Sequence, residues 1–243
     1  MIIAEKDAKS ILSKSQILPY VINPYTGCQH ACIYCYAKFM KRFTGHQEPW
    51  GDFVDVKTNA PELLKKEILK KKRDRVWVSG VCDPYQPLEG KYKLTRQCLE
   101  ILAANNWPVT VQTRSPLVTR DIDILKTGSE FEVGMSITTG NDDIRKLFEP
   151  HAPSIQSRVS ALEELHSTGI RTFAMIAPLL PDAEGLGEQL SGKIDHVIFD
   201  RMNYSNATWV YRQNGLMEFL SDEYYDRTMT LLSSKFASSG IDL

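Results

Sequence analysis

The chain has 243 residues, of which 42% are hydrophobic and 24% are charged, and its formal net charge is −1. This length and hydrophobic content predict one medium-sized domain with a core of its own. The near-balance of charge argues against a globally basic nucleic-acid binder, although it leaves room for a local basic patch. The N-terminal residues lack the apolar core of a signal peptide, and no apolar run approaches the ~20 residues that span a bilayer. We therefore expect a soluble, cytoplasmic protein without a membrane partner.

Short hydrophobic runs alternate with helical patterns along most of the chain. Residues 1–19 are polar and mixed, so we expect an N-terminal arm laid over the domain. Strands are expected after it at residues 20–25, 75–79, 109–113, 132–137, 171–177 and 196–199. Helices are expected at residues 36–43, 59–69, 95–105, 119–126, 158–166 and 182–190, with a further short helix that ends at 148. A loop rich in Gly and Pro is expected at 44–53.

Six strand–helix units over residues 20–200 predict an α/β fold, with a parallel sheet and helices outside it. The number of units is too small for a closed eight-stranded barrel. Residues 201–243 form a C-terminal tail with a helix at 222–233 that we expect to pack on the core. In sheets of this kind, chemistry gathers at the carboxyl ends of the strands.

Three of the five cysteines, Cys28, Cys32 and Cys35, lie within eight residues in the loop after the first expected strand. Three thiolates on one short loop can converge on a single inorganic centre. A closed [4Fe-4S] cluster takes four ligands, and so does a closed tetrahedral zinc site. The missing ligand therefore predicts an open coordination position that a small molecule can occupy.

Other interpretations of the three cysteines are open at this point. His30 or His46 could complete a zinc site, although the spacing is unlike that of paired zinc knuckles. The cysteines could also be free thiols with a structural role. A disulfide framework conflicts with the odd number of cysteines and with the absence of a secretory signal.

The spacing Cys28-x3-Cys32-x2-Cys35 resembles the signature of the radical S-adenosylmethionine (SAM) enzymes. Further segments resemble the subfamily that is similar to spore photoproduct lyase and is often described as DNA-repair photolyase-like. They include Asn23-Pro-Tyr-Thr-Gly-Cys, Asp83-Pro-Tyr-Gln-Pro and Glu149-Pro-His-Ala-Pro-Ser, and the likeness covers about residues 20–200. These motifs are specific for the superfamily and unspecific for a substrate.

The resemblance implies a partial (βα)6 barrel of the TIM type and two cofactors, a [4Fe-4S] cluster and SAM. Cys28, Cys32 and Cys35 would bind the cluster, and SAM would chelate its open iron. One electron, from a reductant such as ferredoxin or flavodoxin, would then cleave SAM to methionine and a 5′-deoxyadenosyl radical that abstracts hydrogen from a substrate. Tyr34 matches a family aromatic residue that lies near the adenine.

The loop after the second strand carries Gly80, Cys82 and Asp83, which match the family loop that holds the amino end of SAM. Glycine there allows close approach of the backbone to a ligand. Cys82 stands where the family often has a small hydroxyl residue. It is either a passive replacement or a thiol that donates hydrogen or takes part in redox chemistry. The donor cysteine of photoproduct lyase matches Gly80 instead.

Later strand ends supply the remaining candidates for SAM binding. Arg114 matches a family lysine that contacts the SAM carboxylate, with a surface ion pair as the alternative. Ser136 matches a serine near the ribose or carboxylate, unless it is an ordinary strand serine. Arg158 resembles an arginine near Glu149 that binds SAM or positions this carboxylate. Tyr36, with Tyr34, matches a radical-transfer pair, and plain packing is the alternative for Tyr36.

Three functions are compatible with these patterns. The first is a radical enzyme that repairs a nucleic-acid or nucleotide lesion, as spore photoproduct lyase does. The second is a radical enzyme that acts on a peptide, metabolite or cofactor precursor, and the third is a non-catalytic zinc or iron–sulfur module. Several tail side chains could stack on bases or cap the open edge of the barrel: Tyr204, Trp209, Tyr211 and Arg212.

Overall fold

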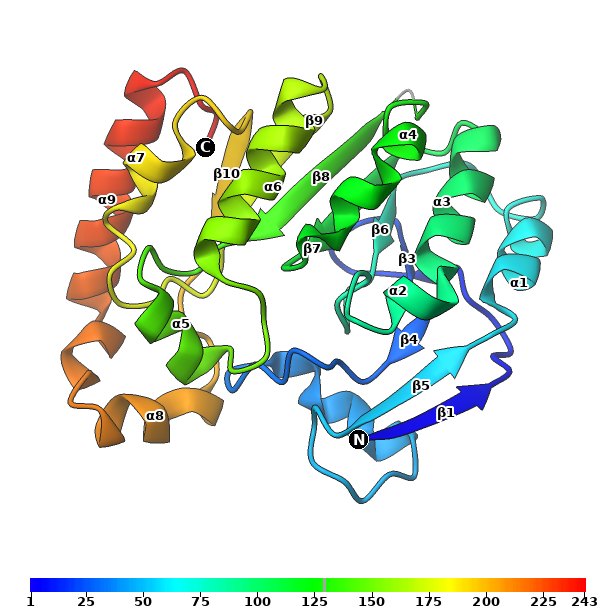
Figure 1. Cartoon of the computed structure of the whole chain (residues 1–243), viewed down its shortest axis with the longest axis horizontal. Coiled ribbons are helices and arrows are strands. Elements are labelled where there is room, and N and C mark those ends of the chain that lie inside the picture. Colours follow the sequence, from blue (N-terminus) through cyan, green and yellow to red (C-terminus); the bar gives the residue numbers. More distant parts are fainter. Residues whose placement is uncertain (129) are drawn as a thin grey trace.

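The computed structural model describes residues 1–128 and 130–243 of the chain, and its main feature is a seven-stranded sheet (Figure 1). The strand order is β10-β9-β8-β7-β6-β3-β2. The strands are β2 (Ser13–Lys14), β3 (Tyr20–Ile22), β6 (Val76–Val78), β7 (Val109–Thr113), β8 (Phe131–Ser136), β9 (Arg171–Ile176) and β10 (His196–Phe199). All neighbours pair in parallel except β2, which runs antiparallel to β3.

The six parallel strands confirm the predicted fold class. From β3 to β10, each parallel strand of the large sheet lies beside the strand of this sheet that precedes it in the chain. This is the arrangement of a partial (βα)6 barrel. The first strand is shorter than the expected 20–25. Asn23 and Pro24 interrupt it, because proline has no N–H to donate to a ladder, and Tyr25–Thr26 forms strand β4 of another sheet.

A small second sheet lies beside the first and was not predicted. It has the order β1-β5-β4, in which β1 (Ile2–Lys6) pairs in parallel with β5 (Phe53–Lys57). The expectation of an arm over residues 1–19 contained no such strand, and Phe53 was expected to end a loop. A strand of five residues whose partner is about fifty residues away leaves only a short alternation in the sequence, so the pairing is hard to predict.

Helices cover the outer face of the large sheet, where Figure 1 shows α3, α4 and α6. The helices and 3-10 helices are η1 (Tyr36–Phe43), α1 (Ala60–Glu67), α2 (Glu89–Tyr92), α3 (Leu94–Ala104), η2 (Pro116–Asp121), α4 (Ile122–Leu125), α5 (Asp142–Phe148), α6 (Ile155–Ser167), α7 (Leu186–Leu190), η3 (Ser205–Ala207), α8 (Thr208–Gln213), η4 (Met217–Leu220) and α9 (Asp222–Ser238). The structure corrects several predicted bounds. Helix α6 begins three residues early because the Ser154 hydroxyl accepts from the Ser157 amide and caps it.

The core lies between the large sheet and its helices. Val78, Val111 and Val133 from the strands pack with helix residues such as Leu99 and Leu162, and all five are fully buried. This layer fixes the strand ends in space. It leaves the inner face of the sheet, toward the carboxyl ends of the strands, available for a cavity.

Candidate active site

A cavity of about 360 Å³ opens at the carboxyl ends of the parallel strands. All six strands or the loops that follow them line it. The residues include Cys28, Cys32 and Cys35 after β3; Gly80 and Cys82 after β6; Gln112 and Arg114 at β7; Ser136 on β8; Ala177 and Pro178 after β9; and Asp200 to Tyr204 after β10. The position is the one expected from the strand–helix alternation.

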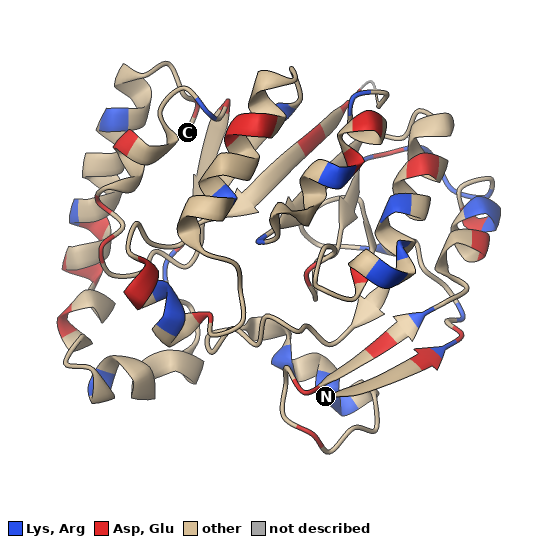
Figure 2. Ribbon diagram, viewed as in Figure 1, with Lys and Arg blue, Asp and Glu red and all other residues tan. Residues whose placement is uncertain are grey.

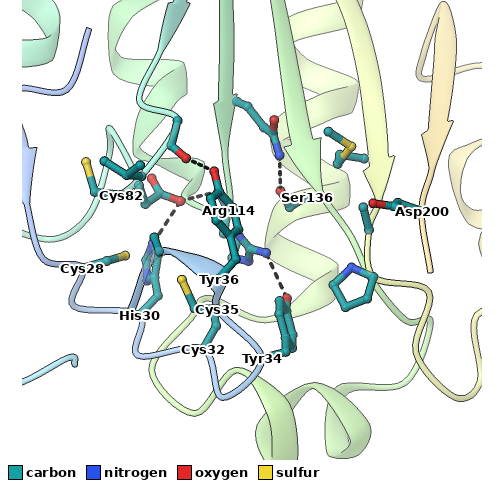
Figure 3. A pocket seen from close by; sticks show the side chains of 18 of the residues that line it. Cys28, His30, Cys32, Tyr34, Cys35, Tyr36, Cys82, Arg114, Ser136 and Asp200 are labelled. Carbon is teal, nitrogen blue, oxygen red and sulfur yellow. Dashed lines mark hydrogen bonds and ion pairs between the residues drawn. The ribbon is translucent and has the colours of Figure 1, made fainter. Parts of the chain in front are cut away.

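The three cysteines of the loop lie on one wall of the cavity, where Figure 3 shows their side chains near Arg114. All three are free, and Cys28 and Cys32 are buried. The Ile33 amide donates to the Phe148 carbonyl at 2.8 Å and ties the loop to α5. A side chain at Gly27, which has a φ of 93°, would collide with the Phe53 carbonyl, so the entry to the loop requires glycine.

These thiols fit an iron–sulfur cluster by their chemistry. Burial raises the pKa of each thiol, and that of Cys32 reaches about 12, so the free thiols are protonated at neutral pH. A metal would displace those protons. Within the described ranges, no three His, Cys, Asp or Glu side chains form a group that could hold a single metal ion. The ligands of a cubane bind different irons, so they need not meet at one point.

Glu149, fully buried, lies at the centre of a polar network in the cavity wall. Arg158 pairs with it at 2.5 Å and Arg114 at 3.2 Å, and the Tyr34 hydroxyl also donates to it. Burial alone would raise the pKa of Glu149, but Arg158 and Arg114, together with the Tyr34 hydroxyl, lower it to about 2. The carboxylate is therefore charged and holds both guanidinium groups in place.

Arg114 and Arg158 play different parts in this network. The Arg158 side chain is completely buried, and it also donates to the Ser136 carbonyl at 2.9 Å. The Arg114 side chain is 18% exposed and lines the cavity, where it also donates to the Tyr34 hydroxyl at 2.9 Å. The expected position of Arg158 beside Glu149 is found, and of these two arginines Arg114 is the one that a cavity ligand can reach.

Asp83 is buried and its oxygens are already occupied by protein donors. They accept from the Thr113 hydroxyl at 2.6 Å, the Arg114 amide at 2.7 Å and the Tyr85 amide at 2.9 Å. His30 lies 3.3 Å away. Burial would raise the pKa of Asp83, but His30 and these hydrogen bonds lower it to about 2. Asp83 thus ties the cysteine loop to the end of β7.

The loop after β6 brings Cys82 and Gly80 to the cavity. Ser79 precedes them with a φ of 69°, which turns the chain sharply. The Cys82 sulfur lies 3.4 Å from the Tyr25 carbonyl and 3.5 Å from the Ser79 hydroxyl, and burial raises the pKa of its thiol to about 11. The Gly80 carbonyl accepts from the Tyr36 hydroxyl.

Ser136 and Tyr36 complete the predicted set, and both line the cavity. The Ser136 hydroxyl accepts from Gln112 at 3.2 Å. Tyr36 is 40% exposed, and its ring stacks on Tyr204 with centroids 6.2 Å apart. The structure therefore brings together every predicted site residue around one cavity. Asp83 belongs to the cavity lining, and Glu149 and Arg158 lie behind it.

Sequence reasoning missed several lining residues. They are Trp50, Gln112, Met175 and the segment Asp200 to Asn203, together with His30 as a partner of Asp83. The segment after β10 could have been found by the same rule that located the other strand ends. Trp50 and His30 gave no comparable signal, because their positions depend on how the loops fold back.

The tail aromatics divide between the two interpretations. Tyr211 is fully buried and packs on Phe148 with ring centroids 4.7 Å apart, so it caps the core and cannot stack on bases. Tyr204 and Trp209 are each about half exposed.

The described part of the chain contains no helix with the length and apolar character needed to span a membrane.

Residues 22–184 match the Radical SAM superfamily, and the chain belongs to it. Members of this superfamily are enzymes that use a [4Fe-4S] cluster and SAM. An uncharacterized protein of Methanocaldococcus jannaschii is 41% identical over 163 residues, which cover 67% of this chain and 61% of that protein. A radical SAM Nalpha-GlyT isomerase of Pseudomonas phage M6 is 28% identical over 65% of this chain and 32% of its own length.

The fold is that of spore photoproduct lyase. The structure of that enzyme complexed with dinucleoside spore photoproduct matches 99% of this chain and 81% of the lyase, with a TM-score of 0.72 and 16% identity. This likeness shows the fold alone. The chain spans about three fifths of the curated Methanocaldococcus relative, so the activity of the whole protein is a matter for proposal.

Proposed function

We propose that the chain reductively cleaves SAM and abstracts a hydrogen atom from a substrate held in the cavity. Cys28, Cys32 and Cys35 would bind the cluster. When bound, the cluster and SAM supply one-electron cleavage to methionine and a hydrogen-abstracting adenosyl radical. The observation that carries this proposal is that three free cysteines line the same cavity as an arginine anchored to a buried carboxylate.

The residues around the cavity suggest how SAM would be held. Arg114 is the cation that we assign to the SAM carboxylate, because its planar guanidinium can bind a carboxylate bidentately. Glu149 and Arg158 position it, because Glu149 pairs with the guanidinium groups of both arginines. Asp83, with its oxygens occupied by protein donors, also acts as a positioning residue, since it accepts from the Arg114 amide.

The other predicted residues contribute shape and polar groups. Gly80 lets the loop backbone approach the amino end of SAM, and Ser136 offers a hydroxyl on the facing wall (Figure 3). Tyr34 would lie beside the adenine. Cys82 and Tyr36, both on the cavity surface, are our candidates for moving a hydrogen atom between substrate and product. We place the protein in the cytoplasm, with ferredoxin or flavodoxin as the reductant.

The test is anaerobic reconstitution with iron and sulfide, followed by SAM and dithionite. We expect the absorbance of a [4Fe-4S] cluster and release of 5′-deoxyadenosine. Cys32→Ala should lose both. Cys98→Ala is the matched control, because Cys98 is a fully buried cysteine in the middle of α3 and should leave the cluster intact. Zinc in place of iron in the purified protein, or an unchanged cluster in Cys32→Ala, would overturn the proposal.

We further propose a nucleobase-containing substrate, as in lesion repair. The structure of spore photoproduct lyase, whose fold this chain shares, is complexed with a dinucleoside photoproduct, and this supports the class. In this chain, Tyr36 and Tyr204 form an accessible stacked pair on the cavity lining. Addition of a substrate oligonucleotide should increase formation of 5′-deoxyadenosine, and a larger increase with a peptide would contradict this class.

A further inference from the structure

The segment that follows the last cluster-loop cysteine forms an exposed surface that combines aromatic rings with cations. We define the η1 surface as Lys38, Phe39, Lys41, Arg42 and Phe43. Phe39 is 43% exposed and Phe43 is 67% exposed. The Arg42 guanidinium lies 5.3 Å from the Phe39 ring centroid and 4.7 Å from that of Phe43. This arrangement presents two exposed aromatic rings and a planar cation together.

Exposed aromatic rings are concentrated here. Among the described residues, the aromatic side chains classed as exposed are Tyr36, Phe39, Phe43, Tyr204 and Trp209. Two of these belong to the η1 surface. Tyr36 stacks on Tyr204 at the cavity and lies one helical turn before Phe39. The same helix, η1, therefore carries exposed rings both at the cavity and on the outer surface.

The charge of the η1 surface is positive and little neutralised. Figure 2 shows its cations on the helix beside the N-terminus, and residues 36–43 contain no acidic residue. The Lys38 and Lys41 ammonium groups donate to the carbonyls of Ile33 and Gln47, and each keeps further donors. The nearby Glu48 pairs with His46. Within the described part of the chain, no carboxylate lies within ion-pair distance of Arg42, Lys38 or Lys41.

We propose that the η1 surface binds a single-stranded nucleic acid and leads one nucleotide into the cavity. Bases stack on exposed aromatic rings, while phosphates pair with Lys and Arg, and the η1 surface offers both within one helix. An acidic protein would use the cations without requiring the rings. The proposal rests on the proposed nucleobase substrate for its purpose, but binding to the surface can be measured independently of SAM cleavage.

The lysines at the end of α1 provide a comparison. Lys70 and Lys72 are exposed and belong to another basic stretch of the chain, but its exposed apolar side chain is Leu69, which offers no ring for stacking. Charge alone would predict similar binding at both places. Charge combined with stacking predicts binding at the η1 surface.

The test uses the cluster-loaded full chain and a fluorescein-labelled 12-nucleotide single-stranded DNA of mixed sequence, with binding measured by anisotropy from 25 to 200 mM KCl. We expect Phe39→Ala/Phe43→Ala to weaken binding about 10-fold or more. Lys41→Gln/Arg42→Gln removes two cations and should make the log–log salt dependence shallower by about 1.4, at about 0.7 for each cation on a single strand. Lys70→Gln/Lys72→Gln is the matched charge control, and we expect it to leave the affinity unchanged.

Three results would overturn the proposal. They are no DNA binding at 25 mM KCl, a loss of affinity in Lys70→Gln/Lys72→Gln as large as that in the η1 variants, or unaltered oligonucleotide binding in the η1 variants. If the η1 variants bind DNA normally but accept electrons from reduced flavodoxin more slowly, the surface belongs to an acidic electron carrier. Uncoupled SAM cleavage should be unchanged in all of these variants. If the unmodified protein does not cleave SAM at all, the proposed function is contradicted, but the measurement of DNA binding remains valid.

Discussion

Two buried networks in this molecule are built from the same residue types but differ in what they face. The cavity network consists of Tyr34, Arg114, Glu149 and Arg158. The remote network consists of Tyr25, Tyr85, Glu89, Arg96, Arg120 and Asp121. In both, fully buried carboxylates accept from arginine and from a tyrosine hydroxyl. Burial and pairing of charge therefore do not by themselves indicate a functional site.

The two networks differ in whether one of their arginine side chains reaches the cavity. Arg114 lines the cavity, whereas the members of the remote network are absent from the cavity lining of the described residues. In the remote network, Arg120 joins Glu89 at 3.0 Å to Asp121 at 2.8 Å, and so connects α2 to the end of η2. The remote network holds elements together, and the cavity network also presents a cation to a ligand.

The largest expected difference comes from removing the central carboxylate. Glu149→Gln leaves Arg158, which is completely buried, without its charge partner, and we expect the free energy of unfolding to fall by ~3–5 kcal/mol. Glu89→Gln should cost less, since Arg120 is partly exposed and keeps Asp121. Urea unfolding measures both losses. Titration calorimetry should show loss of SAM binding in Glu149→Gln alone, and equal loss in both variants would erase the distinction.

Acid should weaken the cavity network in a defined pH window. The pKa of Glu149 is lowered to about 2 in the folded chain, so the carboxylate contributes stability above its unfolded pKa. That contribution, roughly 3 kcal/mol, is lost as the pH falls from about 5 toward 2. Urea unfolding of the cluster-free chain between pH 7 and 3 should show this decline. Glu149→Gln should show a shallower decline, and parallel curves would contradict the assignment.

Removal of the cavity arginine should affect ligand binding more than stability. Arg114→Ala should weaken SAM binding about 10- to 100-fold, because a charge-assisted hydrogen bond is worth about 1.5–3 kcal/mol. Arg114→Lys should fall in between, since lysine keeps the charge without the planar fork. Arg120→Ala, the counterpart in the remote network, should bind SAM normally. Calorimetry of the cluster-loaded variants provides the comparison.

The tyrosine hydroxyls give the smallest expected effect. Tyr34→Phe and Tyr85→Phe each remove one buried hydroxyl donor to a carboxylate, and we expect each to cost about 1 kcal/mol of unfolding free energy. Only Tyr34→Phe should change SAM affinity, by a few-fold, because its hydroxyl also accepts from Arg114. A SAM affinity altered by Tyr85→Phe would show that the two networks are coupled.

Much of the large sheet could be predicted from the sequence. Runs such as Val109–Thr113 and His196–Phe199 appear with the expected bounds, because buried parallel strands read as short hydrophobic segments between helices. The small sheet was missed, since β1 and β5 recognise each other only across the fold. Helix starts were also displaced where a cap such as Ser154 preceded the apolar pattern.

The sequence by itself determined the family, the class of fold and the loop of three cysteines, because spacing and alternation are local properties of the chain. Only the tertiary structure decided that Arg158 lies fully buried against Glu149 and that Asp83 is occupied by protein donors. It also decided that Trp50 and the segment after β10 reach the cavity. These facts depend on distances between residues that are far apart in the chain. Such distances are set only when the sheet and its loops fold.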